Sequence, residues 1–483
     1  MLKTIAIDIG GSGGKAFVTD YDGKTLIVRE IMRFANNPVY MGDAYCWDLP
    51  RLVHDVKHCL QAASGDGNAV SFGIDTWGAS MGMLDARGQL LSLPRHYRDA
   101  EYAGIDQEVF KLLSRQAFFQ RIGCSTEGNI ALFQCYAQRL YAPEVFAAAK
   151  RVLMTADLIR YFLTDTAICE ETLAGTGGLV EPYTRTRNDC DLELLGLDPE
   201  RFPQPVRAGS IAGRLSSRVA RELSVPRIAA IAVAGHDTAS AVLTLPQETE
   251  DCFLILGTWG LMGVVTDRLI VTERALQRNC VNELNPEGKI RFLRNAPGMW
   301  IYDQCRAQWG VGHDQLLRDA ENAPPFRAWI DVEDPMFHSP GDMPARIRAY
   351  LAATGQQDMA SAGAMIRCVF ESMACKYRQA LEALREDTER PLRIIHAVGG
   401  GTHCPLLMKM IAAATGCEVR VGQYEASAVG NALMQLVALG ELRNAREARE
   451  LAQRSFATRT VFPPKEQAWE DAYARYRTIV GAL

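Results

Sequence analysis

Residues 5–20 read IAIDIGGSGGKAFVTD, and residues 252–267 read CFLILGTWGLMGVVTD. In an ungapped alignment Gly10 matches Gly257, Gly13 matches Gly260, and both stretches end in Val-Thr-Asp. Each stretch is an apolar segment, a glycine turn and a second apolar segment, which predicts a β-hairpin. One hairpin opens each half of the chain.

This repetition predicts two related domains with a site between them, because small-molecule clefts often lie at domain interfaces. We place the boundary in the polar stretch 245–251, which divides the chain into residues 1–245 and 246–483. The alternative is that both stretches are ordinary glycine-turn hairpins of unrelated origin, and the sequence leaves it open.

Three further apolar runs, each followed by a glycine-containing turn, lie outside the hairpins. They are the predicted strands at residues 69–74, 228–234 and 394–398. The second and third continue in helix-compatible sequence, from 239 and from about 404 to 415. Alternation of strands and helices predicts an α/β fold.

The composition narrows the class of protein. Of 483 residues, 48% are apolar and 23% are charged, and the formal net charge is -5. There is no long basic run, so neither a nucleic acid nor an anionic membrane is expected as a partner. No run of 18 apolar residues occurs, and the 13 cysteines include no CxxC pair. The thiols are expected to be reduced, and the protein cytoplasmic.

The first glycine turn has the properties of a phosphate-binding loop. Gly11, Ser12, Gly13 and Gly14 allow backbone N–H groups to approach anionic oxygens, and Lys15 adds a positive charge. Asp8 ends the preceding strand, where an acid would repel phosphate unless a divalent cation lay between them. Asp8 therefore suggests Mg²⁺, held through water. The loop is not a Walker A motif, and a plain turn is the alternative.

Two later glycine turns are further candidates for nucleotide binding. Thr258 follows Gly257 in the second hairpin and could offer its N–H and hydroxyl to a phosphate. Gly399, Gly400 and Gly401 join a strand to a helix and would allow an adenine or ribose to lie close to the backbone. Each is, by itself, also compatible with a tight structural turn.

Asp237 is the candidate catalytic base. It follows a buried apolar strand and precedes a helix-compatible segment. Phosphoryl transfer needs one carboxylate to accept the proton of the attacking hydroxyl, and the carboxyl end of a strand in an open sheet is a suitable place for it. The alternative is that Asp237 or Thr238 only caps the helix.

Taken together, these segments resemble the FGGY carbohydrate kinases, and among them the rhamnulokinase branch. The resemblance covers roughly residues 4–440. Its blocks are AIDIGGSGGK (6–15), GIDTWG (73–78), YRD (97–99), GHDTASAV (235–242), GTWGLMG (257–263), VGGG (398–401) and EASAVGNALMQ (425–435). GIDTWG and HDTASAV carry the resemblance to rhamnulokinases.

The resemblance implies an α/β protein of two ribonuclease-H-like, actin-like ATPase domains with an interdomain active-site cleft. The first domain would bind the sugar and the second the nucleotide, with ATP and Mg²⁺ as cofactors and transfer of the γ-phosphoryl group to the 1-hydroxyl of L-rhamnulose. The residues implied are Asp237 as base, Gly78, His236, Thr238 and Asn295 for the sugar, and residues 11–15, Thr258, Asp303 and Gly401 for the nucleotide.

The sequence also departs from the pattern of these kinases. Ala79-Ser80 stands where rhamnulokinases have Val and an acidic residue, and GTGGLVEP (175–182) looks more like the fuculokinase branch. An L-fuculokinase, or a kinase of another deoxy-ketose or pentulose, is therefore the alternative. A non-catalytic sugar or nucleotide sensor is a second alternative. The sequence leaves monomer and homodimer open.

Overall fold

Both repeated stretches form β-hairpins in the computed structural model, which describes residues 1–65, 68–464 and 467–481. In the first, β1 (Leu2–Ile9) pairs antiparallel with β2 (Gly13–Tyr21), and Asp8 lies opposite Lys15. In the second, β13 (Asp251–Leu256) pairs antiparallel with β14 (Gly260–Thr266). The two predicted hairpins are confirmed.

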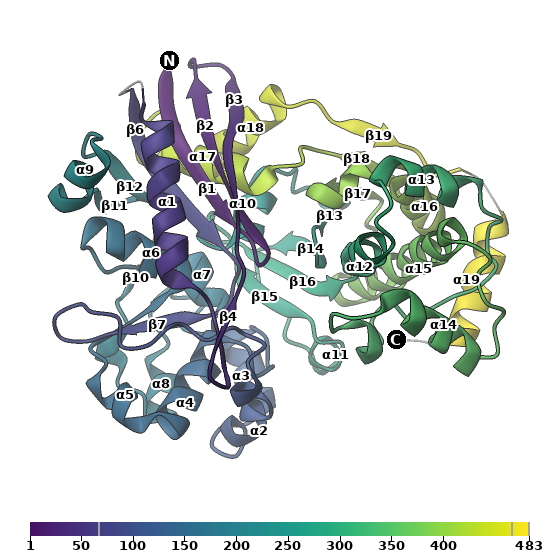
Figure 1. The fold of residues 1–483 in the computed structure, drawn as a ribbon, viewed down its shortest axis with the longest axis horizontal. Coiled ribbons are helices and arrows are strands. Elements are labelled where there is room, and N and C mark those ends of the chain that lie inside the picture. Colours follow the sequence, from purple (N-terminus) through teal and green to yellow (C-terminus); the bar gives the residue numbers. More distant parts are fainter. Residues whose placement is uncertain (66–67, 465–466, 482–483) are drawn as a thin grey trace. The chain divides into compact units, whose positions relative to one another are not determined.

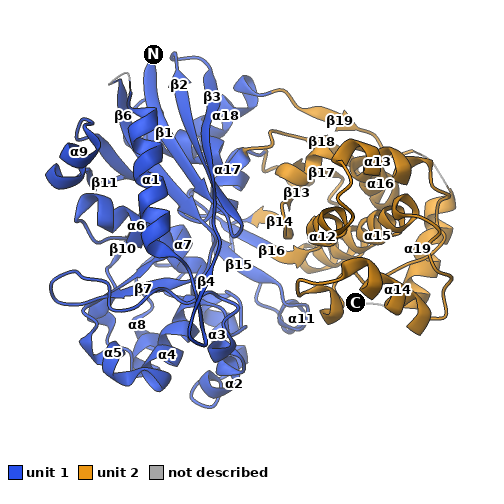
Figure 2. Cartoon of the chain, in the orientation of Figure 1, with its two compact units in different colours: residues 1–245, 266–292, 426–456 blue, residues 246–265, 293–425, 457–483 orange. Residues whose placement is uncertain are grey.

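The chain forms two compact units (Figure 2). The first comprises residues 1–245, 266–292 and 426–456, and the second comprises residues 246–265, 293–425 and 457–483. Two segments that follow residue 245 therefore group with the first unit. One of them carries helix α17 (Ala426–Ala438), which packs against β1, β6 (Ala69–Thr76) and α10 (Asp237–Leu243).

The sheet of the first unit has six strands in the order β11-β12-β6-β1-β2-β3 (Figure 1). The three strands not yet described are β3 (Leu26–Ala35), β11 (Ser210–Arg214) and β12 (Ala229–Ala232). β1 and β12 each pair parallel with β6, whereas β3 pairs antiparallel with β2 and β11 antiparallel with β12. The predicted strands at 69–74 and 228–234 are β6 and β12.

The second sheet repeats the same arrangement around its hairpin. Its order is β15-β16-β14-β13-β17-β18-β19. The remaining strands are β15 (Val281–Leu284), β16 (Ile290–Ala296), β17 (Ile394–Val398), β18 (Glu418–Val421) and β19 (Arg459–Val461). β13 pairs antiparallel with β14 and parallel with β17, as β1 does with β2 and β6. The sequence repeat thus corresponds to a repeated strand topology.

Helices cover the sheet of the first unit on both faces, and the alternation of side chains along β1 shows which residues face which helix. Ile5 and Ile7 belong to the large core that includes Leu52 and Val56 of α1 (Leu49–Ala63). Ala6 instead packs with Ala428 of α17. Asp8 follows Ala6 at a spacing of two and therefore faces α17.

The other helices of the first unit connect the strands or form a lobe of short helices. They are α2 (Ile105–Val109), α3 (Arg115–Ile122), α4 (Ala131–Tyr141), α5 (Pro143–Ala148), α6 (Thr155–Thr164), α7 (Glu171–Thr176), α8 (Asp189–Leu194), α9 (Ser217–Leu223), α11 (Glu273–Gln277) and α18 (Ala445–Ser455). Short strand pairs in this part of the chain are β4 (Val39–Met41) with β5 (Ala44–Cys46), β7 (Met81–Leu84) with β8 (Arg151–Met154), and β9 (Cys169–Glu170) with β10 (Pro205–Val206).

The second unit is built around one long, largely buried helix, α15 (Ala362–Thr388), which packs against α13 (His313–Asn322) and α16 (Pro405–Thr415). Its other helices are α12 (Trp300–Trp309), α13 (His313–Asn322), α14 (Met343–Ala353), α16 (Pro405–Thr415) and α19 (Gln467–Val480). The predicted helix at about 404–415 is α16. No helix in the described part of the chain is long and apolar enough to cross a membrane.

Candidate active site

Asp237 is the first residue of α10 and lies directly after the loop that follows β12. The loop is fixed from two sides. Gly235 donates its N–H to Oε2 of Glu170 at 2.9 Å, and its carbonyl accepts from the N–H of Thr76 at 2.9 Å. Glu170 also accepts the N–H of Leu173, at the start of α7. The position of Asp237 is therefore set by the end of β6 and by a buried glutamate.

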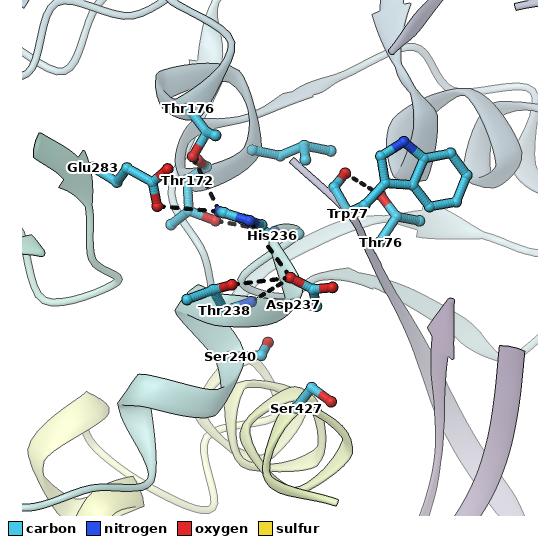
Figure 3. Close-up of polar contacts among 12 residues, drawn as sticks. Thr76, Trp77, Thr172, Thr176, His236, Asp237, Thr238, Ser240, Glu283 and Ser427 are labelled. Carbon is cyan, nitrogen blue, oxygen red and sulfur yellow. Dashed lines mark hydrogen bonds and ion pairs between the residues drawn. The ribbon is translucent and has the colours of Figure 1, made fainter. Parts of the chain in front are cut away.

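The Asp237 carboxylate is held through one of its two oxygens (Figure 3). Oδ1 accepts the backbone N–H of Thr238 at 2.6 Å and the Thr238 hydroxyl at 3.2 Å. Nε2 of His236 lies 3.5 Å from the same oxygen. Burial raises the pKa of Asp237, and the neighbouring His236 opposes this rise. The N-cap position of α10 is His236 and no described side chain caps this helix, so Asp237 does not act as the cap, and its Oδ2 is not used in these contacts.

Two more carboxylates lie at the ends of neighbouring parallel strands, Asp8 on β1 and Asp75 on β6, which are register partners. Helix α17 supplies a hydrogen-bond donor to each. Ser427 donates to Oδ2 of Asp8 at 2.6 Å, and Asn431 donates to Oδ2 of Asp75 at 2.6 Å. Burial, then the charge of Asp237, raises the pKa of Asp8 to about 6, and burial, then the charge of Asp8, raises that of Asp75.

The glycine turn that precedes Lys15 is closed by a hydrogen bond from Gly10 N–H to the Gly13 carbonyl at 2.9 Å. The side chain of Asn36 donates to the Gly10 carbonyl at 2.9 Å and braces the turn. Gly11 and Ser12 are exposed, whereas Gly14 is covered by the ring of Phe34, which a Cβ at position 14 would approach to 2.1 Å. Exposed turn residues next to a fixed, covered glycine fit a loop that offers backbone N–H groups to an anion.

Gly78 and His236, two of the predicted sugar-contacting residues, lie against each other. A Cβ at Gly78 would lie 2.8 Å from Nε2 of His236 and 2.7 Å from Cγ2 of Thr176, so a larger residue there would require these side chains to move. Thr238, the next predicted contact, holds Asp237. The structure thus brings Gly78, His236, Asp237 and Thr238 into one site in the first unit.

Residues that the sequence reasoning missed complete the surroundings of His236. Thr176 lies 3.1 Å from Nδ1, Oε2 of Glu283 lies 3.4 Å from it, and Nη2 of Arg291 lies 3.3 Å from it. Glu283 and Arg291 come from β15 and β16, and neither stands in a recognisable motif. Ser427 and Asn431 were also missed, although polar residues spaced by four in an apolar helix were a usable signal.

Two of the predicted nucleotide residues of the second unit, Thr258 and Gly401, lie at the second glycine turn. The Thr258 carbonyl accepts the N–H of Trp300, at the start of α12, at 3.2 Å. A Cβ at Gly298 would lie 2.2 Å from that carbonyl, and a Cβ at Gly401 would lie 2.5 Å from Cγ of Leu256. Thr258 and Gly401 therefore flank one closely packed turn at the end of β13.

Asp303 and Asn295 occupy other positions in this unit. Asp303 is in the first turn of α12, and its carboxylate lies 3.8 Å from the guanidinium of Arg306. Burial raises the pKa of Asp303, and the charge of Arg306 opposes this. Asn295 lies on β16 with an exposed side chain.

Ser80, one of the departures from the rhamnulokinase pattern, has a structural contact in this protein. Its hydroxyl accepts the indole N–H of Trp47 at 2.9 Å, and its backbone is left-handed, with φ of 82°. The Trp47 ring packs against Trp77 with ring centroids 4.0 Å apart. Ser80 therefore orients an aromatic pair that adjoins Gly78 in sequence.

Comparison with known proteins assigns both halves of the chain. Residues 3–244 match the model of the N-terminal domain of the FGGY family of carbohydrate kinases, and residues 252–439 match the model of its C-terminal domain. The chain belongs to the FGGY family of carbohydrate kinases. It is an ATP-dependent sugar kinase of this family, as the sequence resemblance predicted.

Curated relatives of this FGGY kinase include rhamnulokinases. That of Bacteroides thetaiotaomicron is 35% identical over 478 residues, which cover 98% of this chain and 99% of the relative. That of Bacillus subtilis is 31% identical and covers 95% of each chain.

Solved structures show the same fold at low sequence identity. A xylulose kinase from Lactobacillus acidophilus has a TM-score of 0.82 at 16% identity, covering 99% of this chain and 98% of its own. A Plasmodium falciparum glycerol kinase solved with ADP has a TM-score of 0.77 at 13% identity, with the same coverage of both chains. The predicted two-domain α/β fold of the actin-like ATPase type is therefore confirmed.

Proposed function

We propose that this kinase transfers the γ-phosphoryl group of ATP to the 1-hydroxyl of L-rhamnulose, with Asp237 as the general base. The observation that carries the proposal is the Asp237 carboxylate at the start of α10, with Oδ1 occupied by Thr238 and His236 beside it. A carboxylate fixed through one oxygen is oriented so that the other can accept a proton.

In this proposal Oδ2 of Asp237 accepts the proton of the attacking sugar hydroxyl. The hydroxyl oxygen forms a bond to the γ-phosphorus of ATP, and the bond from that phosphorus to the β–γ bridging oxygen breaks and releases ADP. The raised pKa of Asp237 makes its carboxylate a stronger base than an exposed aspartate. Gly78, His236, Thr238 and Asn295 would position the sugar. Phosphoryl transfer depends mainly on positioning and on neutralisation of charge, so one base of this kind is sufficient.

The nucleotide would be held by the two glycine turns. Residues 11–15 would donate backbone N–H groups and the Lys15 charge to phosphate oxygens. Thr258 would do the same from the second turn, and Asp303 and Gly401 would lie near the adenosine. The closely packed turns support this assignment, because backbone N–H groups bind anions well only when their directions are fixed.

The residues around Asp8 fit Mg²⁺ held through water. In the described part of the chain no group of three or more His, Cys, Asp and Glu residues is arranged to bind a metal ion directly. Burial and the charge of Asp237 raise the pKa of Asp8, and a nearby cation would relieve this repulsion. When bound, the cation would neutralise charge on the transferred phosphoryl group.

Because ATP is consumed, we place the reaction in the cytoplasm.

The choice of L-rhamnulose rests on GIDTWG and HDTASAV and on the rhamnulokinase relatives that match nearly the whole chain. An L-fuculokinase is the second candidate, because GTGGLVEP resembles that branch and Ser80 replaces an acidic residue. Position 80, where the acidic residue is missing, closely follows Trp77 and Gly78 in the sequence, and a change there would alter which sugar hydroxyls are bound.

The decisive experiment is an ATP-consumption assay against L-rhamnulose, L-fuculose, L-ribulose and D-xylulose, with NMR identification of the phosphorylated carbon. We expect the highest kcat/KM for L-rhamnulose and a 1-phosphate product. Activity confined to L-fuculose would change the substrate assignment from L-rhamnulose to L-fuculose, and the enzyme would still be a sugar kinase. Binding of ketose and ATP without turnover on any of them would indicate a sensor.

A further inference from the structure

We propose that the hydroxyl of Tyr97 donates a hydrogen bond to the phosphoryl group that passes from ATP to the sugar. Tyr97 is then a further catalytic residue, because it touches the reacting group. The inference rests on the proposed function in that residues 11–15 are taken to hold the phosphates of ATP, but it does not depend on which ketose is the acceptor. It also gives a role to YRD (97–99), one of the blocks that carry the family resemblance.

The backbone on both sides of Tyr97 is fixed by hydrogen bonds. Before it, the N–H of His96 donates to the Tyr45 carbonyl at 2.8 Å. After it, the N–H of Arg98 donates to Nδ1 of His96 at 3.0 Å. The buried carboxylate of Asp99 accepts the N–H of Tyr45 at 2.6 Å. The YRD block is thus tied to β5 at two points, and Tyr97 is presented from a fixed loop.

The Tyr97 hydroxyl lies beside the first glycine turn. A Cβ added at Gly11 would be 3.7 Å from the hydroxyl oxygen, which is an ordinary van der Waals distance. Gly11 and Ser12 are exposed, so an anion bound to the N–H groups of this turn would lie next to the hydroxyl. A tyrosine O–H is a suitable donor for an anionic oxygen.

The other neighbours of the Tyr97 ring lie on the sugar side of the site. Its centroid is 6.0 Å from that of Trp47, whose ring lies 4.0 Å from Trp77. Trp77 directly follows Thr76, whose N–H is bonded to the loop before Asp237 (Figure 3). Tyr97 therefore spans from the phosphate turn to residues beside the proposed base. During the reaction the transferred phosphoryl group passes between these two places.

Positive charge next to Tyr97 suits an anionic ligand. The guanidinium carbon of Arg98 lies over the Tyr97 ring, 5.6 Å from its centroid, and the Arg98 side chain is exposed. This charge adds to that of Lys15 in the glycine turn. The hydroxyl keeps its proton throughout, because Asp237 accepts the proton that the sugar releases. Its contribution is to hold and orient the phosphoryl oxygens.

The direct test is calorimetric binding of ADP and of the non-hydrolysable ATP analogue AMP-PNP, both with Mg²⁺, to the full-length wild type and to Tyr97→Phe. The two ligands differ in the terminal phosphoryl group, so a contact with that group affects only one of them. Tyr97→Phe should weaken AMP-PNP binding about tenfold, the lower end of what one hydrogen bond to a charged group contributes, and leave ADP binding unchanged. Unchanged AMP-PNP binding, or an equal loss for both nucleotides, would overturn the inference.

Kinetics separate this role from a contact with the sugar. With the ketose that the wild type phosphorylates best, Tyr97→Phe should lower kcat/KM for ATP about tenfold and leave the KM for the ketose unchanged. A rise in ketose KM with unchanged kinetics towards ATP would place the hydroxyl on the sugar and contradict the inference. Tyr161→Phe is the matched control, because the half-buried Tyr161 also has its hydroxyl at a glycine turn, where it donates to the Gly88 carbonyl at 3.3 Å. It should change neither constant.

Lys15→Met tests the proposed function separately. If this variant leaves the binding of ADP and AMP-PNP unchanged, the assignment of the first glycine turn to the nucleotide is wrong. If Lys15→Met weakens nucleotide binding and Tyr97→Phe does not, the nucleotide site stands and only the role of Tyr97 is refuted. Tyr97→Phe keeps the ring that lies near Trp47, so its Tm should equal that of the wild type.

Discussion

The hydroxyl of Ser427 donates a 2.6 Å hydrogen bond to Oδ2 of Asp8, although 419 positions separate the two residues in the sequence. The bond joins α17 to the end of β1, next to the glycine turn. It is one of the interactions that lower the pKa of Asp8 against the effects of burial and of the Asp237 charge.

Ser427→Ala should therefore raise the pKa of Asp8 beyond its value of about 6. A hydrogen bond to a charged group contributes about 1.5–3 kcal/mol, so a shift on the order of one pH unit is expected. The acidic limb of the pH profile of kcat/KM should move to higher pH by that amount. Ser455→Ala, which removes a hydroxyl that accepts the Leu26 N–H, is the control and should leave the limb in place. If the acidic limb of the pH profile is unchanged in Ser427→Ala, the ionisation of Asp8 does not control kcat/KM.

Asp237→Asn should lower kcat by about 10²–10⁴-fold, because it removes the general base and keeps the shape of the side chain. Binding of ATP, measured by calorimetry, should change little. Turnover at the wild-type rate would exclude Asp237 as the base. If the variant loses both ATP binding and turnover, Asp237 has a structural role instead.

Asp75→Asn should stabilise the protein relative to the wild type, and this gain in stability should be larger at pH 8 than at pH 5. Burial and the charge of Asp8 raise the pKa of Asp75 in the folded state. Above its ordinary pKa of 3.8 the folded protein then binds more protons at this site than the unfolded chain, so the free energy of unfolding falls as pH rises through that window. The asparagine does not titrate and can still accept from Asn431.

The measurement is the difference in Tm between Asp75→Asn and the wild type across pH 5 to 8, with Asp267→Asn, an exposed carboxylate, as control. A difference that does not depend on pH would show that Asp75 is ionised in the folded protein at all these values.

Gly78→Ala should raise the KM for the ketose and leave that for ATP unchanged. The added Cβ would lie 2.8 Å from Nε2 of His236 and 2.7 Å from Cγ2 of Thr176, so the ring must move. Gly312→Ala is the matched control, because a Cβ there meets no atom within 4 Å. Equal effects of both substitutions on ketose KM would remove Gly78 from the sugar site.

Local sequence was sufficient for the features that depend on neighbouring residues. Both hairpins, the strands at 69–74 and 394–398, and the placement of Asp237 at a helix start follow from apolar runs that end in glycine turns. The grouping of Gly78, His236 and Thr238 around Asp237 came from the family resemblance rather than from the residues alone.

The residues that were missed reach the site from distant positions. Glu283 and Arg291 stand in ordinary strands, and nothing in their own stretch of sequence marks them as buried beside His236. Helix α17 is different, because Ser427, Asn431 and Gln435 recur every four residues in an otherwise apolar segment. All three contact β1 or β6, and Gln435 accepts the Ser71 hydroxyl at 2.7 Å and donates to the Ile5 carbonyl at 2.8 Å. This spacing would have predicted a helix face that packs against polar groups.

The return of residues 426–456 to the first unit has a consequence for synthesis on the ribosome. When the first 245 residues have emerged, Asp8 and Asp75 still lack the donors Ser427 and Asn431. At ~5–20 residues per second, the nascent chain waits roughly 10–40 s for these partners. We expect the amino-terminal portion to be most vulnerable to proteases and most dependent on chaperones during that interval.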